Sequence, residues 1–83
     1  MRLEKKLNIK DLESHLDSLD LDDGVRIDDS KKKMFINKTN ADEFILQIKM
    51  QNGSENIYYY RSASKVMRMV NTTFNGKFSI SIY

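Results

Sequence analysis

The chain has 83 residues, no Cys and a formal net charge of +2 at pH 7. This length predicts one domain over residues 1–83, with a thin core, because a chain this short buries only about 60% of its unfolded surface. The apolar fraction of 40% and the charged fraction of 31% are typical of a folded protein. The lack of Cys excludes disulfides, thiolate nucleophiles and Cys-ligated zinc.

Localisation is inferred from what the sequence lacks. The first residues lead into no apolar stretch of signal-peptide length. No apolar run approaches the roughly 20 residues that span a bilayer. Small secreted domains usually need disulfides, so we expect a cytoplasmic protein without membrane contact.

Charge is distributed unevenly along the chain. Residues 1–30 hold five Lys and Arg and nine Asp and Glu, a balance of −4. Residues 31–83 hold nine Lys and Arg and three Asp and Glu, a balance of +6. The asymmetry indicates either ordinary solvated faces or a bipolar surface that steers a charged partner.

Two amphipathic segments predict helices. The first has apolar residues at helical spacing, namely Ile9, Leu12, Leu16 and Leu19. Asn8 is its expected N-cap, and Gly24 is expected to end the segment in a left-handed conformation. Ser62 is the expected N-cap of the second helix, and Asn75-Gly76 its C-cap pair. The stripe of the second helix comprises Ala63, Val66, Met67, Val70 and Phe74.

Strands are predicted by alternation of apolar and polar residues. Residues 25–27 and 34–36 form one expected hairpin, and residues 44–50 and 57–61 a second one. Between the latter, Asn52-Gly53 is typical of a two-residue turn in which both residues take positive φ. That turn pairs Gln51 with Ser54, which places Tyr59 on the core face and Tyr58 and Tyr60 on the other face. A final strand is expected over residues 78–83.

The fold class that follows is α+β, in the order α-β-β-β-β-α-β. We expect a single sheet of four or five strands, with two helices packed on one face. The sheet should be antiparallel, with the alternative of a mixed sheet if the helical crossover leaves the last strand parallel to its predecessor.

The sequence offers little for catalysis or for a cofactor. His15, the only His, lies at the edge of the first helical stripe, where packing is the simpler role. The three glycines are isolated and form no phosphate-binding loop. The acidic run from Asp20 to Asp29 does not match a calcium loop, because Lys occupies position 31 and no Glu follows until Glu43. We therefore expect no enzyme activity, no metal and no cofactor.

Two local features favour macromolecular binding. Lys31-Lys32-Lys33 either solubilises a sheet edge or contacts phosphates or an acidic protein surface. If both helices cover the other face, Tyr58 and Tyr60 form an exposed patch. Such a patch favours binding, because Tyr is enriched at interfaces and can stack on bases. If one helix covers each face, both tyrosines belong to the core instead.

We therefore expect a non-enzymatic module that regulates or inhibits a macromolecular partner, most simply a protein. Small chains rich in Lys, Asn, Ile and Tyr are frequent among viral and mobile-element products. An inhibitor of a nucleic-acid-handling enzyme, such as an anti-CRISPR protein, is one specific version, by analogy of size and architecture. The expected contact residues are Tyr58, Tyr60, Ile45, Lys49, Lys31, Lys32, Lys33, Arg61, Lys65 and Arg68.

Three alternatives remain open. An acidic contact face that mimics phosphates would use Asp11, Asp17, Asp20, Asp22, Asp23, Asp28 and Asp29. Direct nucleic-acid binding would use the basic and tyrosine residues. A self-associating subunit would pair edges through the strand from Phe78 to Tyr83.

Overall fold

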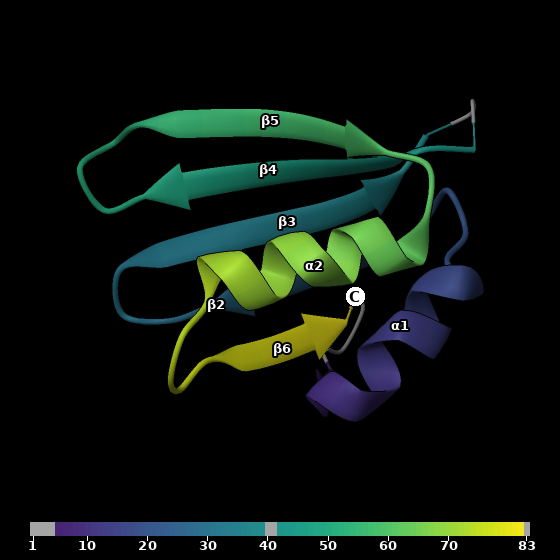
Figure 1. Cartoon of the computed structure of the whole chain (residues 1–83), viewed down its shortest axis with the longest axis horizontal. Coiled ribbons are helices and arrows are strands. Elements are labelled where there is room, and N and C mark those ends of the chain that lie inside the picture. Colours follow the sequence, from purple (N-terminus) through teal and green to yellow (C-terminus); the bar gives the residue numbers. More distant parts are fainter. Residues whose placement is uncertain (1–4, 40–41, 83) are drawn as a thin grey trace.

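The computed structural model describes residues 5–39 and 42–82 of the chain as one antiparallel sheet with two helices on one of its faces (Figure 1). The strands are β1 (Lys5–Leu7), β2 (Gly24–Asp28), β3 (Lys32–Lys38), β4 (Phe44–Met50), β5 (Glu55–Tyr60) and β6 (Ser79–Ile82). The helices are α1 (Ile9–Asp17) and α2 (Ala63–Thr73). The α+β class and the helices on one face are therefore confirmed.

The sheet has six strands, in the order β1-β6-β2-β3-β4-β5, so the expectation of four or five was too low. The strand missed from the sequence is β1, whose three residues are too few to show alternation. The alternative of a mixed sheet is wrong. After β5 the chain crosses the sheet through α2, and β6 runs in the same direction as β5 (Figure 1). It does not pair with β5, however, but inserts between β1 and β2, antiparallel to both.

The β2–β3 hairpin has the expected strands. Val25 lies opposite Ile36 and Ile27 opposite Met34, and all four side chains are buried on the face that the helices cover. We call this the helix face and the other side of the sheet the open face.

The β4–β5 hairpin has a different register from the predicted one. Its loop has three residues, because Met50 rather than Gln51 pairs with Ser54: the Met50 N–H donates to the Ser54 carbonyl at 2.9 Å. Gly53 has a φ of 93°, whereas Asn52 is not among the described residues with positive φ. The Asn52 side chain instead accepts from the Ser54 N–H at 3.0 Å. This is a three-residue hairpin loop that ends in a left-handed Gly.

The shift of one residue reverses the faces of β5. Leu46 lies opposite Tyr58 and Phe44 opposite Tyr60, so both tyrosines are on the helix face. Ile45 lies opposite Tyr59 and Gln47 opposite Ile57, which places Tyr59 and Ile57 on the open face. The prediction that Tyr58 and Tyr60 occupy the open face is therefore wrong.

The helices begin where the sequence indicates. Ser62 caps α2, since its Oγ accepts from the Lys65 N–H at 3.2 Å, whereas Asn8 precedes α1 without a side-chain cap bond. Gly24 is the first residue of β2 and is not left-handed, which corrects its expected role. Gly76, with a φ of 91°, lies in the loop that leads from α2 to β6.

The core lies between the two helices and the helix face of the sheet. It joins leucines of α1 and small apolar residues of α2 to alternate residues of β2, β3, β4 and β6. Its fully buried large side chains include Leu12, Leu16, Ile27, Met34, Ile36 and Leu46. Among residues 5–39 and 42–82, no helix is long and apolar enough to cross a membrane.

Candidate functional site

The open face of the sheet is the candidate functional surface, because neither helix packs on it (Figure 1). Its two halves differ in how their side chains are engaged. Polar residues occupy the half formed by β1, β6 and β2, whereas the half formed by β3, β4 and β5 combines aromatic and aliphatic residues with polar and charged ones.

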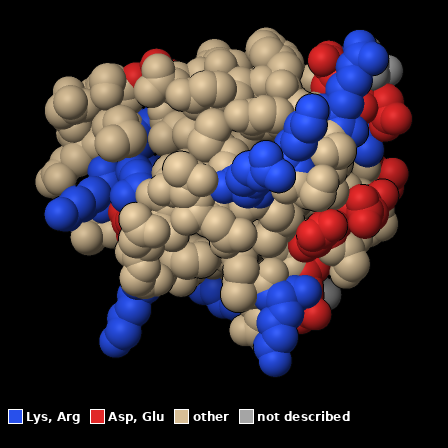
Figure 2. All heavy atoms as spheres, in the orientation of Figure 1, with Lys and Arg blue, Asp and Glu red and all other residues tan. Residues whose placement is uncertain are grey.

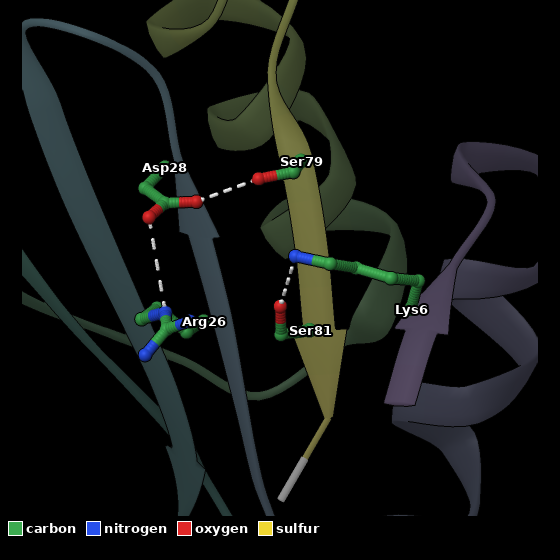
Figure 3. Close-up of polar contacts among 5 residues, drawn as sticks. All are labelled: Lys6, Arg26, Asp28, Ser79 and Ser81. Atoms are coloured by element: carbon green, nitrogen blue, oxygen red, sulfur yellow. Dashed lines mark hydrogen bonds and ion pairs between the residues drawn. The ribbon is translucent and has the colours of Figure 1, made fainter. Parts of the chain in front are cut away.

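Polar side chains contact one another across the first half, which is formed by β1, β6 and β2 (Figure 3). Lys6 Nζ donates to Ser81 Oγ at 3.1 Å, and Ser79 Oγ donates to Asp28 Oδ1 at 2.8 Å. Arg26 Nε lies 3.9 Å from Asp28 Oδ2. Ser81 is fully buried even though it is on the open face. Two hydrogen bonds and one ion pair thus engage these side chains within the protein, so we regard this half as structural.

The second half carries the open-face patch, which we define as Phe35, Ile45, Gln47, Ile57 and Tyr59. Phe35, Gln47 and Ile57 form one row across three strands, and Ile45 and Tyr59 form the next row. Ile57 is 52% exposed and Tyr59 58% exposed, so two large side chains are left in water at the β5 end of the patch. The arrangement offers apolar contact area with a phenol hydroxyl and an amide for hydrogen bonds.

A row of charged residues borders the open-face patch. On four adjacent strands it contains Asp28, Lys33, Lys49 and Glu55, so the two lysines lie opposite each other and each has an acid on its outer side. Lys49 Nζ also lies 5.8 Å from the centroid of the Phe35 ring, within the range of a cation–π contact. Glu55 accepts a hydrogen bond from Gln47. The border therefore offers both signs of charge.

Tyr58 and Tyr60 lie at the edge of the helix face. Their rings stack with centroids 6.4 Å apart and an interplanar angle of 14°. Tyr60 packs against the core, whereas Tyr58 is 37% exposed beyond the cover of the helices.

The structure separates the predicted basic residues. Lys49 shares the open face with Ile45, as the sequence predicts, and Lys33 lies opposite Lys49 on the same face. Lys31 is exposed in the β2–β3 turn, where it lines a shallow hollow of about 220 Å³ together with Lys33, Lys49 and Gln51. Lys32 points to the helix face, with its Nζ 5.4 Å from the Phe74 ring centroid. Lys65 and Arg68 are exposed on α2, on the opposite side of the molecule from the open face.

The β2–β3 turn depends on one carboxylate. Asp29 Oδ1 accepts from the Lys31 N–H at 2.7 Å and from the Lys32 N–H at 2.9 Å, and Oδ2 lies 3.2 Å from Lys32 Nζ. The hydrogen bond from the Lys31 backbone, together with the contacts of Lys32, holds the pKa of Asp29 below its ordinary value, against the opposing effect of burial. Asp29 and Asp28 are thus engaged in structural contacts.

The remaining acidic residues lie around α1. Asp11, Asp17, Asp20 and Asp22 are exposed and Asp23 is half-buried. Figure 2 shows most Asp and Glu on the right of the view, over α1 and above it, and Lys and Arg over α2 and at the left end of the sheet. Lys and Arg also lie among the acids at the right and lower edges, so the charge asymmetry of the sequence is only partly kept on this side of the molecule.

His15 lies half-buried on α1, and its Nε2 has no hydrogen-bond partner among the described residues. Within residues 5–39 and 42–82, no group of three or more His, Cys, Asp or Glu side chains is placed to hold a metal ion.

Sequence reasoning missed Ile57 and Tyr59 as surface residues, and it overlooked Phe35. Alternation within β5 is compatible with either face, so only the loop could have decided between them. The relevant signal is Ser54, whose N–H and Oγ both donate to Asn52 Oδ1 and thereby favour the three-residue loop.

Comparison with known proteins gives no family for this chain: no protein-family model, no curated protein and no solved structure matches it. The function is therefore argued from the surface itself.

Proposed function

We propose that this chain is a non-enzymatic binding module that regulates or inhibits a protein partner, which it contacts through the open-face patch. The observation that carries the proposal is the exposure of Ile57 and Tyr59 side by side on a face that the helices leave uncovered. Fully burying an exposed large apolar side chain contributes about 1.5–3 kcal/mol, and about half of that remains to be gained at Ile57 and at Tyr59, which are 52% and 58% exposed.

The surroundings of the patch also suit a protein partner. Interfaces commonly have an apolar, aromatic centre and a polar rim that fixes orientation. Here Lys33, Lys49 and Glu55 border the centre with both signs of charge. Since this border carries both signs, with the two lysines adjacent and acids on their outer sides, we expect a partner surface with matching mixed charge rather than a uniformly anionic one.

The test is affinity capture from the native host with three tagged proteins, each with and without nuclease. The unaltered chain and the variant Leu21→Ser should both retain one protein in near-stoichiometric amount after nuclease treatment. Tyr59→Ser should lose it. Leu21 is the matched control, because it is 56% exposed in the loop between α1 and β2, away from the sheet. Equal retention by Tyr59→Ser would refute the role of the open-face patch.

Direct nucleic-acid binding is the second candidate, favoured by one observation. Lys31, Lys33 and Lys49 line one hollow beside Phe35, and Tyr59 lies further along the same face. Lysines can neutralise phosphates while aromatic rings stack on single-stranded bases. If so, affinity for an oligonucleotide should fall steeply with salt, and Lys33→Ala should lower the slope by about one. No binding at about 50 mM salt would reject this candidate.

An inhibitor that acts as a phosphate mimic would use the other side of the molecule. The exposed acids of α1 and of the following loop, including Asp11, Asp17 and Asp20, would then occupy an arginine-rich groove. In the capture experiment this version predicts that Tyr59→Ser keeps the partner and that Asp11→Asn with Asp17→Asn weakens its retention.

A further inference from the structure

The outer edge of β5 is an unpaired strand edge of the sheet. β5 is the last strand in the order and pairs only with β4. The bond from the Met50 N–H to the Ser54 carbonyl shows that even-numbered residues of this strand direct their backbone groups toward β4. Since these directions alternate along a strand, the N–H and C=O groups of Glu55, Ile57 and Tyr59 point outward.

This edge lacks the features that usually prevent pairing. Natural sheets shorten their edge strands, place Lys or Pro on them, or cover them. The opposite edge, β1, is only three residues long, whereas β5 has six residues and contains no Lys, Arg or Pro. Every residue from Glu55 to Tyr59 is exposed. Figure 2 shows charged atoms only toward the two ends of the border that β5 occupies in Figure 1.

We propose that the edge of β5 pairs with β5 of a second copy of this chain, antiparallel and about a two-fold axis at Tyr58. This inference goes beyond the proposed function and does not depend on it. In this register Ile57 lies opposite Tyr59 of the second copy, and each such pair joins two outward-pointing residues that can exchange both backbone hydrogen bonds. Tyr58 lies opposite Tyr58 of the second copy, at the closely spaced kind of pair where side chains contact best.

Charge selects this register among those that the backbone allows. It places Glu55 opposite Arg61 of the second copy, at both ends of the interface. Arg61 directly follows the last residue of β5, its Nε lies 3.9 Å from Glu43 Oε2, and its side chain is 82% exposed. Extending the β5 register by one residue sets Arg61 opposite Glu43, and we infer from this that it lies on the same face as Glu55. A register centred on Ile57 would instead set Glu55 opposite Tyr59 of the second copy and provide no cation for the carboxylate across the interface, where Lys49 of the same chain is its only cross-strand cation. Because opposite residues share a face, pairing also joins the two open-face patches into one surface.

The experiment measures mass against concentration by sedimentation velocity for the full chain and three charge variants. The unaltered chain should dimerise with increasing concentration. Glu55→Arg alone and Arg61→Glu alone should each weaken the dimer about tenfold or more, because each sets like charges opposite one another at both ends. The double variant Glu55→Arg, Arg61→Glu should dimerise again, and an equimolar mixture of the two single variants should form a heterodimer.

Both positions are exposed, and they are separated by the length of β5, because Glu55 is its first residue and Arg61 directly follows its last, so rescue can arise only between copies. Circular dichroism should show all variants folded. A monomer at every soluble concentration overturns the proposal, and so does a dimer that the charge changes leave unaffected. Ile57→Lys, which places a Lys on the edge, should also give a monomer, whereas the matched control Leu21→Lys should not. Mass and partner capture are separate readouts, so failure here is distinguishable from failure of the open-face proposal.

Discussion

Lys33 lies directly opposite Lys49 in the β3–β4 ladder, on the open face of the sheet. Like charges at directly opposite positions are destabilising by about 0.2–1 kcal/mol. A double-mutant cycle with Lys33→Ala and Lys49→Ala should therefore give an unfavourable coupling of a few tenths of a kcal/mol in low salt. Urea unfolding measures it, and the coupling should shrink in about 1 M salt. A favourable coupling would contradict a repulsion between the two ammonium groups, because the cycle cancels the separate contacts of each lysine with Asp28 and Glu55.

The cap of α2 should contribute more to stability than the residue before α1. Ser62 Oγ accepts from the Lys65 N–H, whereas Asn8 makes no side-chain cap bond. Ser62→Ala should therefore lower the free energy of unfolding by about 1 kcal/mol, and Asn8→Ala by much less. Denaturant titration of both variants checks this contrast. Equal losses at the two positions would contradict it.

Gly53 should be sensitive to substitution because of its backbone alone. Its φ of 93° is one that residues with a side chain rarely adopt, yet an added Cβ would meet no heavy atom within 4 Å. Gly53→Ala should therefore cost about 1–2 kcal/mol, and Gly53→Asn less, because Asn tolerates left-handed conformations better. Thermal unfolding of the two variants measures the difference. If Ala and Asn cost the same, local strain is not the cause.

Acid should weaken the β2–β3 turn. Because the pKa of Asp29 is lower in the folded state than in the unfolded one, its charge stabilises the fold above the ordinary aspartate pKa of about 3.9. That contribution is lost as the pH falls from there through the lower folded value. Asp29→Asn should flatten this part of the stability–pH curve. Lys32→Gln should raise the pKa of Asp29 only partway, since the backbone donors of Lys31 and Lys32 remain, and NMR titration measures the shift.

His15 should be replaceable by an apolar residue with a gain in stability. Its Nε2 is buried without a hydrogen-bond partner among the described residues, and an unsatisfied buried polar atom costs about 1–3 kcal/mol. His15→Leu should therefore raise the melting temperature, while His15→Ala should not, because it also removes packing. Calorimetry of both variants tests this, and a lower melting temperature for His15→Leu would contradict it.

The sequence predicted both helices, the hairpin strands and the side of the sheet that the helices cover. Those features depend on local periodicity, as in the stripe of Leu12 and Leu16 or the alternation from Phe44 to Met50. The position of β6 was not predictable in this way, because its pairing with β2 and β1 joins segments far apart in the chain. The predicted face of Tyr59 was wrong because the loop between β4 and β5 has three residues rather than two, which shifts the register by one residue.

The position of β6 has a consequence for synthesis on the ribosome. Ser79 bonds to Asp28 across a separation of 51 residues, so β2 leaves the ribosome long before the strand that covers its second edge. At a synthesis rate of about 5–20 residues per second, that edge of β2 has no partner strand for roughly 3–10 seconds. During this interval the side chains that β6 helps to bury are accessible to ribosome-associated chaperones and to neighbouring nascent chains. Transient exposure of apolar surface and of an unpaired strand edge favours misassembly during synthesis.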